Sequence, residues 1–201
     1  MLSSRFRLIC ILGSLIYSTH VGASLNPSNL AMIAGVPSSG PPDIRIRIKR
    51  DLKKINISGM DISREVIPNK RKDAFSGRGS FRFNCDQIKS VLSRKQLAHK
   101  MPLLLAAFES PTGLIGLGNE KFRGKLLVLT APERESCDVI NQTDMESYIG
   151  SLLAQEMNKT WPIEALKAQA EAARTYAYSH MMNPSGKSED QFFDLENSEK
   201  H

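Results

Sequence analysis

The sequence lacks most of the motifs by which common catalytic sites are recognised. It has no glycine-rich phosphate loop, no HExxH and no CxxC, so no motif predicts a P-loop nucleotide site, a zinc protease or a dithiol redox centre. Its four histidines are scattered along 201 residues, and their spacing does not favour a Ser-His-Asp site. A long-period repeat and a low-complexity tract are absent as well. We therefore expect no cofactor.

The hydrophobic run near the N-terminus is too short to cross a bilayer. Residues 8–17 supply about ten positions, whereas a spanning helix needs roughly twenty. Arg5 and Arg7 precede this run, and the small residues 21–23 follow it. This order is typical of a secretory signal peptide rather than of the competing alternative, a membrane anchor. We expect cleavage after Ala23 and export to the periplasm or cell wall, with no stable membrane span.

Cysteine is also scarce, with three residues in the whole chain. Cys10 lies in the apolar part of the predicted signal peptide, which leaves Cys85 and Cys137 in the mature protein. In an oxidising compartment these two residues can form one disulfide, but two buried thiols are an equally good interpretation.

The positive charge of the chain is modest, and aromatic residues are few. The formal net charge is +6, and it stays positive after the predicted cleavage, which removes Arg5 and Arg7. Such a surface suits an anionic polymer. The densest basic clusters, residues 49–54 and 70–72, contain no aromatic residue that could stack on a base. We therefore expect no nucleic acid as a partner.

The composition divides the chain into three predicted parts. Residues 1–23 form the signal peptide, residues 24–42 a flexible linker with a Pro/Ser/Gly-rich end, and residues 43–201 one domain. Alternation and apolar runs predict strands at 44–49, 55–58, 103–109, 114–117 and 125–130, and helical spacing predicts a helix at 85–98. The sequence thus predicts an α+β fold with a strand-rich body and two consecutive helices that carry the site.

These two helices are predicted between residues 143 and 180. Residues 143–146, Thr-Asp-Met-Glu, form a capping box at the start of the first helix. The second helix begins at Trp161 or Pro162, because proline suits the first helical position. Glu156 lies in the junction, where a carboxylate reaches a bound substrate more readily than on a solvated helix face. A structural alternative for Glu156 is a carboxylate that caps the second helix.

The second helix is amphipathic. One side carries apolar or small residues, namely Ile163, Leu166, Ala170, Ala173 and Ala177. The other side carries Glu164, Lys167, Glu171, Arg174 and Tyr178. Because the side chains of Ala170 and Ala173 are small, we expect a neighbouring element to approach this helix closely. Trp161 is expected to pack at the helix entry rather than to stack on a sugar.

Several motifs in the second half of the chain carry a family resemblance. They are Phe122-Arg123-Gly124, Val139-Ile140-Asn141, residues 145–150 (MESYIG), Gln155-Glu156-Met157, and the run WPIEALKAQAEAARTYA from Trp161. This part of the chain, roughly residues 121–201, strongly resembles the SpoIID/LytB family. That family comprises the stage II sporulation protein D and the amidase-enhancer proteins.

The resemblance implies that the chain acts on peptidoglycan glycan strands. Enzymes of the family are lytic transglycosylases, and Glu156 matches their catalytic glutamate, a single general acid and base. Gln169 and Arg174 stand at family-matching positions, and we expect them to bind an acetamido or carboxylate group of the glycan. For Arg174 an intrahelical pair with Glu171 is the alternative. The second function that the resemblance implies is non-catalytic, because amidase enhancers bind the wall or a partner cell-wall amidase.

The end of the sequence departs from the family pattern. Residues 193–201 match the start of a family segment that normally continues, so we expect a domain that is incomplete at its C-terminus. Some members bind a metal through cysteine and histidine in this segment. Here the cysteines are not matched and His201 stands alone, so we expect no metal.

Overall fold

The computed structural model describes residues 42–98, 101–158, 160–182 and 192–197. These residues belong to one unit, residues 38–201. The predicted signal peptide, the linker up to residue 41, and His201 lie outside the described residues. Among the helices that are described, none is both long and apolar enough to cross a membrane.

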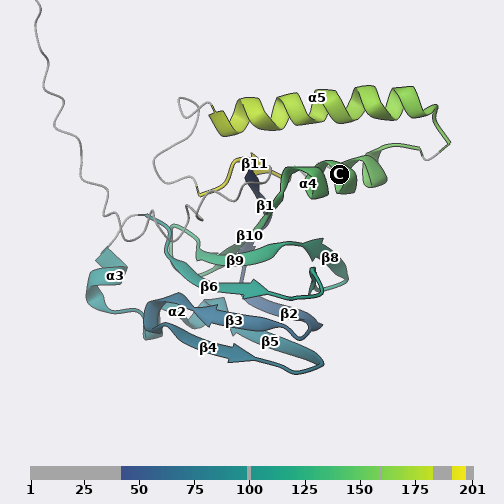
Figure 1. Ribbon diagram of the computed structural model, residues 1–201. Helices are drawn as coiled ribbons and strands as arrows, with labels where there is room; N and C mark the ends of the chain where they lie inside the picture. Colours follow the sequence, from purple (N-terminus) through teal and green to yellow (C-terminus); the bar gives the residue numbers. More distant parts are fainter. Residues whose placement is uncertain (1–41, 99–100, 159, 183–191, 198–201) are drawn as a thin grey trace, which may run out of the picture. The chain divides into compact units, whose positions relative to one another are not determined.

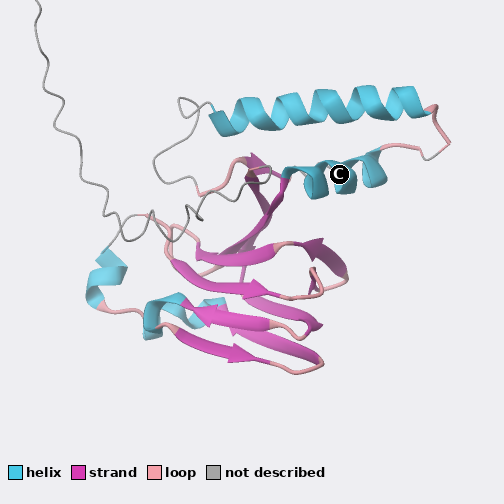
Figure 2. Cartoon of the chain, viewed as in Figure 1, coloured by secondary structure: helices cyan, strands magenta, loops and turns pink. Residues whose placement is uncertain are grey.

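Two sheets form the body of the described domain (Figures 1 and 2). The larger sheet has the strand order β11-β1-β10-β9-β6-β3-β4 and the smaller one β5-β2-β7-β8. Neighbouring strands are antiparallel except for β11, which pairs with β1 in parallel. The strands are β1 (Asp43–Leu52), β2 (Lys54–Met60), β3 (Ser63–Val66), β4 (Arg71–Ala74), β5 (Arg78–Asn84), β6 (Leu104–Glu109), β7 (Leu114–Leu117), β8 (Glu120–Arg123), β9 (Lys125–Thr130), β10 (Cys137–Asp144) and β11 (Leu195–Glu196).

The helices lie at three places along the described chain. They are the short helices η1 (Ile67–Asn69), η2 (Cys85–Gln87), α2 (Ile88–Val91) and α3 (Arg94–Ala98), and the longer helices α4 (Met145–Glu156) and α5 (Ile163–Met182). Figure 1 shows α4 and α5 running in opposite directions, joined by residues 157–162 at one end. The predicted α+β class, with a strand-rich body and two consecutive helices, is confirmed.

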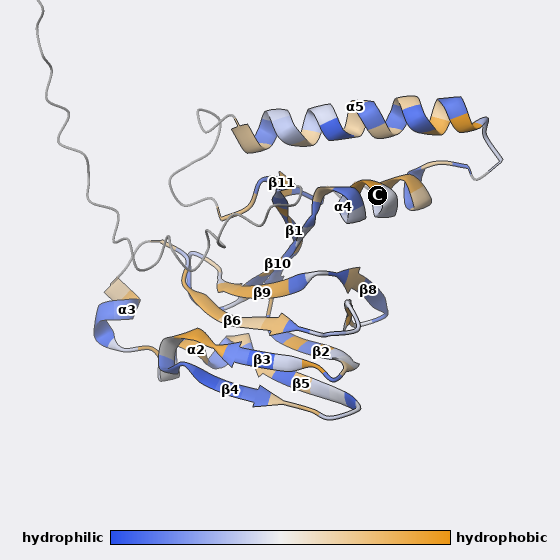
Figure 3. Cartoon of the chain, in the orientation of Figure 1, coloured by the Kyte–Doolittle hydropathy of each residue, from blue (hydrophilic) through white to orange (hydrophobic). Residues whose placement is uncertain are grey.

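The core follows from the alternation of apolar residues along the strands. Ile44, Ile46 and Ile48 are buried on one face of β1, while Arg45 and Arg47 between them are partly exposed. Strand β9 is buried on both faces, and Figure 3 shows it and β6 as predominantly hydrophobic. Strands predicted at 114–117 and 125–130 coincide with β7 and β9, and those predicted at 44–49, 55–58 and 103–109 lie within or overlap β1, β2 and β6.

Strand β10 is the main element that the pattern did not predict. It lies between β1 and β9 in the larger sheet, although it contains the polar residues Asn141 and Thr143. Both side chains are buried, at 7% and 6% exposure. Polar residues in the middle of a strand break the apolar pattern from which strands are recognised.

The prediction of one helix at residues 85–98 is wrong in one respect. In the structure this segment forms three short helices, η2, α2 and α3. Leu92 is extended and ends α2, and Ser93 caps α3. The backbone N–H of Ser93 donates to Oε1 of Gln96, and the N–H of Gln96 donates to Oγ of Ser93. This is a reciprocal capping box, which favours a new helix start at this point.

A disulfide joins the start of this helical segment to the larger sheet. Cys85 in η2 is bonded to Cys137, the first residue of β10, and the two Cα atoms are 5.6 Å apart. Both residues are fully buried. Of the two interpretations left open by the sequence, the disulfide is therefore confirmed.

The starts of α4 and α5 both lie slightly later than predicted. Asp144, not Thr143, caps α4, and its carboxylate accepts from the backbone N–H of Ser147 at 2.8 Å. Helix α5 begins at Ile163, because the carbonyl of Pro162 accepts the first helical hydrogen bonds, from Ala165 and Leu166. Proline therefore precedes the first helical residue here.

The packed side of α5 is close to the predicted one. Ala170 and Ala173 pack against the core and Ala177 is fully buried, so the expected close approach is confirmed. Two residues are placed differently from the prediction: Ile163 is 62% exposed, and Tyr178 packs against the core instead of lying on the solvated side. Ile163 is the first residue of the helix, where the chain turns away from α4.

Because of the disulfide, we expect reduction to lower the stability of the protein strongly. Replacing Cys85 and Cys137 together by serine should lower the free energy of unfolding by about 2 to 4 kcal/mol, because the cross-link restricts the unfolded chain. Denaturant unfolding of the oxidised, reduced and double-serine forms would measure this. An oxidised form no more stable than the double-serine variant would contradict it.

The burial of Ala177 predicts that a larger side chain will be poorly accommodated. Ala177→Leu should overpack the contact of α5 with the core and destabilise the protein by about 1 to 3 kcal/mol. Ala172→Leu is the matched control, because Ala172 is exposed on the same helix. Equal unfolding midpoints for the two variants would show that the buried side of α5 has been assigned incorrectly.

Candidate functional site

A groove of about 1020 Å³ lies between helices α4 and α5 and the end of the larger sheet. It is lined by two helix faces and by four segments of the strands. The lining on α4 is Ser147, Tyr148, Ser151, Leu152, Gln155 and Glu156, and that on α5 is Gln169, Ala172, Ala173, Tyr176 and His180. These residues recur at helical spacing, so each helix turns one continuous face to the groove. The remaining lining comes from β1, β8, β10 and the segment around β11.

Helix α4 is held at the groove by the strand that precedes it. Asp144 ends β10 and caps α4, and the buried side chains of Met145 and Ile149 anchor the helix to the core. Burial opposes ionisation of Asp144, but hydrogen bonds from the side chain and backbone of Ser147 outweigh it and lower the pKa of this carboxyl. The cap is therefore ionised at neutral pH, which suits the positive end of the helix dipole.

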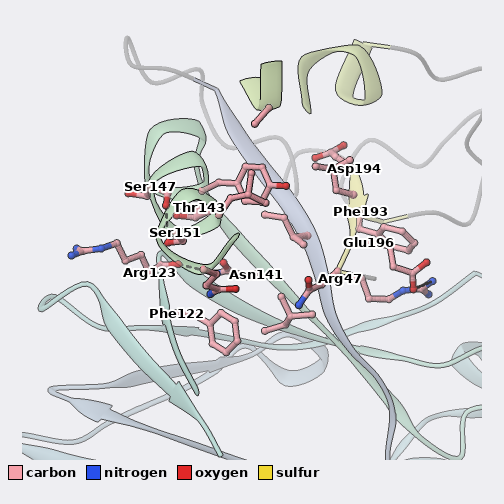
Figure 4. A pocket seen from close by; sticks show the side chains of 18 of the residues that line it. Arg47, Phe122, Arg123, Asn141, Thr143, Ser147, Ser151, Phe193, Asp194 and Glu196 are labelled. Atoms are coloured by element: carbon pink, nitrogen blue, oxygen red, sulfur yellow. Dashed lines mark hydrogen bonds and ion pairs between the residues drawn. The ribbon is translucent and has the colours of Figure 1, made fainter. Parts of the chain in front are cut away.

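The bottom of the groove is formed by a clamp that the side-chain amide of Asn141 makes on the turn between β8 and β9. Its Nδ2 donates to the carbonyl oxygens of Arg123 and Lys125, at 2.8 and 3.1 Å. Between them Gly124 has φ +84°, and a Cβ there would collide with the carbonyl oxygen of Gln142. Figure 4 shows Asn141 below α4, with the Arg123 side chain extending outward. The motifs around Phe122 and Asn141 are thus in contact.

Thr143 adds a buried polar atom to the same wall. Its Oγ1 is buried and has no hydrogen-bond partner among the described residues, and the residue lines the groove. A buried hydroxyl without a hydrogen bond costs free energy. The Thr143 hydroxyl is therefore a natural hydrogen-bond partner for an ordered water.

Glu156, the predicted catalytic residue, is the last residue of α4 and lines the groove. The side chain of Glu156 is exposed, and Trp161, which was expected to pack at the helix entry, is 51% exposed. Tyr148 lines the same groove two helical turns earlier on α4. Burial raises the pKa of the Tyr148 phenol, and the negative charge of Glu156 raises it further. The phenol therefore stays neutral and can donate a hydrogen bond at physiological pH.

The other two groove carboxylates are held by arginines. Asp194 accepts hydrogen bonds from the backbone and guanidinium of Arg45, and Glu196 pairs with Arg47 and Arg50. Figure 4 shows Asp194 and Glu196 on the side of the groove away from Ser147. Within the described residues Glu156 is the one groove carboxylate that forms no ion pair.

The structure separates the two predicted substrate-binding residues. Gln169 lines the groove together with Glu156. Arg174 does not line it, because its guanidinium donates two hydrogen bonds to Glu146 of α4, at 2.9 and 2.8 Å. This ion pair lowers the pKa of Glu146 and raises that of Arg174. Arg174 therefore pairs across helices, not primarily with Glu171 as in the alternative.

Several groove residues were not predicted from the sequence. Tyr148, Tyr176 and His180 were missed because a helical pattern alone does not show which side of a helix meets a groove. The available signal for Asn141 and Thr143 was their polarity within an otherwise apolar segment. No group of three or more metal-ligating side chains occurs among the described residues.

Part of the chain matches a known protein family. Residues 133–201 match the family model SpoIID, stage II sporulation protein, so the predicted family resemblance is confirmed for this part of the chain. The matched segment contains β10, α4, α5 and β11. A SpoIID domain indicates a protein related to the cell wall and of the sporulation type.

The chain is also similar to an uncharacterised protein of Brachyspira hyodysenteriae. The two are 37% identical over 94 residues, which cover 47% of this chain and 24% of that protein. The matched part thus spans about a quarter of the relative's length. No solved structure matches the chain.

The Asp144 cap predicts a pH-dependent contribution to stability. Asp144→Ala should cost about 1 kcal/mol at pH 7, because a cap hydrogen bond to the N-terminus of α4 is lost. Since the folded-state pKa is lowered, this stabilisation is present above the unfolded value near pH 4 and is lost as the pH falls through the folded value.

Thermal unfolding between pH 2 and 8 would measure the difference between the two proteins. The control is Asp144→Asn, which keeps a side chain able to cap but does not titrate, and it should retain most of the stability at pH 7. A deficit of Asp144→Ala that stays the same at every pH would contradict the assigned role of the carboxylate.

Proposed function

We propose that the protein cleaves peptidoglycan glycan strands as a lytic transglycosylase, with Glu156 as the single general acid and base. The observation that supports this most is the distribution of charge in the groove. Of its three carboxylates, Asp194 and Glu196 are bound to arginines, whereas Glu156 forms no ion pair among the described residues. A group that gives up and regains a proton must not be held ionised by a neighbouring cation.

In the proposed reaction the carboxyl of Glu156 first donates its proton to the oxygen of the glycosidic bond. The bond between that oxygen and the anomeric carbon then breaks. The 6-hydroxyl of the same sugar attacks the anomeric carbon, and its proton returns to Glu156. The product ends in a 1,6-anhydro ring and no water is consumed, so a second carboxylate that activates water is not required.

Export of the protein is part of this proposal. The predicted signal peptide, residues 1–23, and the linker that follows it would deliver the domain of residues 43–201 to the periplasm or cell wall, where peptidoglycan is found.

A second candidate function is binding of the wall, or of a cell-wall amidase, without catalysis. The exposure of Glu156 favours this alternative, because a general acid is usually shielded from water by its surroundings. The two functions differ in their products, since an enhancer forms no anhydro ends.

Replacing Glu156 by Gln tests the proposal. The variant keeps the size of the side chain but cannot transfer a proton, so formation of anhydro ends should fall by about 100-fold or more. The measurement is mass spectrometry of purified glycan strands after incubation with the protein. The matched control is Glu164→Gln, an exposed carboxylate on α5 outside the groove, which should leave the rate unchanged.

Three results would decide between the candidates. Loss of product in Glu156→Gln alone supports the transglycosylase. An absence of anhydro product from the unmodified protein, together with equal stimulation of an amidase by both versions, supports the enhancer. Product formation by Glu156→Gln at the unmodified rate would remove Glu156 from the mechanism.

A further inference from the structure

One wall of the groove carries an aromatic side chain whose exposure the packing of the domain does not explain. Tyr176 of α5 is 58% exposed and lines the groove. The other large hydrophobic residues that are strongly exposed in the described part of the chain, including Trp161, Ile163 and Met182, do not line it. An exposed ring is therefore placed at the groove specifically.

The ring of Tyr176 is held in position by His180, one helical turn further along α5. The two ring centroids are 4.2 Å apart, with planes inclined at 41°. Nδ1 of His180 lies 3.1 Å from the carbonyl oxygen of Tyr176. These contacts restrict the orientation of the Tyr176 ring before any ligand binds, which favours binding.

Small side chains adjoin this pair on the groove face of α5, since Ala172 and Ala173 lie one turn earlier and also line the groove. The proposed catalytic residue, Glu156, lines the same groove from α4. A ligand that covers Tyr176 is therefore bound in the groove that contains the carboxylate.

We infer that Tyr176, positioned by His180, is a stacking platform for a pyranose ring of the glycan, in the groove that Glu156 also lines. This inference rests on the proposed function and assigns a binding residue to the same site. A pyranose has an apolar face of C–H bonds that suits an aromatic ring, and a rim of hydroxyl groups. Hydrogen-bonding side chains that match this rim line the groove, namely Ser147, Ser151, Gln155 and Gln169.

The chemistry of the groove favours a sugar over an apolar peptide segment. A peptide that docks through apolar anchors needs aliphatic or aromatic pockets on both walls. On α4 the groove face presents Leu152 and Tyr148, both half-buried, among serines and a glutamine. The single exposed ring of Tyr176, surrounded by polar side chains, matches the one apolar face of a pyranose and its rim of hydroxyl groups.

The test is the affinity for soluble glycan strands, measured by isothermal titration calorimetry. All variants are made in the Glu156→Gln protein, so that the strands are not consumed during the titration. Tyr176→Ala should raise the Kd by about tenfold or more, whereas Tyr176→Phe, which keeps the ring, should change it by less than about threefold. Trp161→Ala, which removes an aromatic residue outside the groove that is 51% exposed, should have no effect.

His180→Ala tests the positioning role with a readout that a general loss of stability would not change. Saturation-transfer NMR should show weaker transfer to the C–H face of the sugar, while circular dichroism and the unfolding midpoint stay as in Trp161→Ala. Unaltered transfer in His180→Ala would remove His180 from the platform.

The platform and the proposed function can fail separately. If Tyr176→Ala binds glycan as tightly as its parent, the platform is wrong, even where anhydro products are still formed. If binding depends on Tyr176 but the unmodified protein forms no anhydro ends, the platform stands and the catalytic proposal fails. The inference is also overturned if the unmodified protein binds no glycan. It is overturned as well if Tyr176→Ala loses binding to an amidase instead of binding to glycan.

Discussion

The side-chain amide of Asn141 ties the turn between β8 and β9 to the end of β10, and the groove depends on this clamp. The amide donates to the carbonyls on both sides of Gly124, and Gly124 has no Cβ to keep the turn away from the backbone of β10. Four residues after Asn141 the strand continues into α4, whose cap is Asp144. The rim formed by β8 and the helix that carries Glu156 are thus fixed on the same strand. Contacts of the short Asn141 side chain and of Gly124 with the backbone, rather than long side chains, determine their separation.

The second wall of the groove is attached in a different way. Helix α5 packs through small residues, of which Ala177 is fully buried, and through the ion pair between Arg174 and Glu146. An exposed ion pair contributes little to stability because water screens it. Its two hydrogen bonds nevertheless set the position of α5 along α4. Arg174 therefore acts on the groove indirectly, whereas Gln169, the other residue expected from the sequence to bind glycan, lines the groove.

The sequence predicted those elements whose signals are local. Strands such as β7 and β9 have apolar runs or alternation, and the location of Glu156 at the end of α4 followed from the start signals of the next helix. Strand β10 was missed because Asn141 and Thr143 interrupt its apolar pattern, and these are the residues that shape the groove. The partner of Arg174 lies 28 positions away on another helix, a contact that intrahelical spacing does not reveal. Neither the functional role of polar residues inside a strand nor a contact between two helices can be recognised without the tertiary structure.

The arrangement of charges explains how one carboxylate can differ from its neighbours in the same groove. Asp194 and Glu196 hold the segment around β11 on β1 through arginines, so their charge is used for structure. An arginine beside Glu156 would favour its ionised form and oppose the proton transfer proposed for it. Tyr148, which lines the same groove on α4, has a raised pKa and carries no charge at physiological pH. The environment of Glu156 is therefore compatible with a group that must lose and regain a proton within one catalytic cycle.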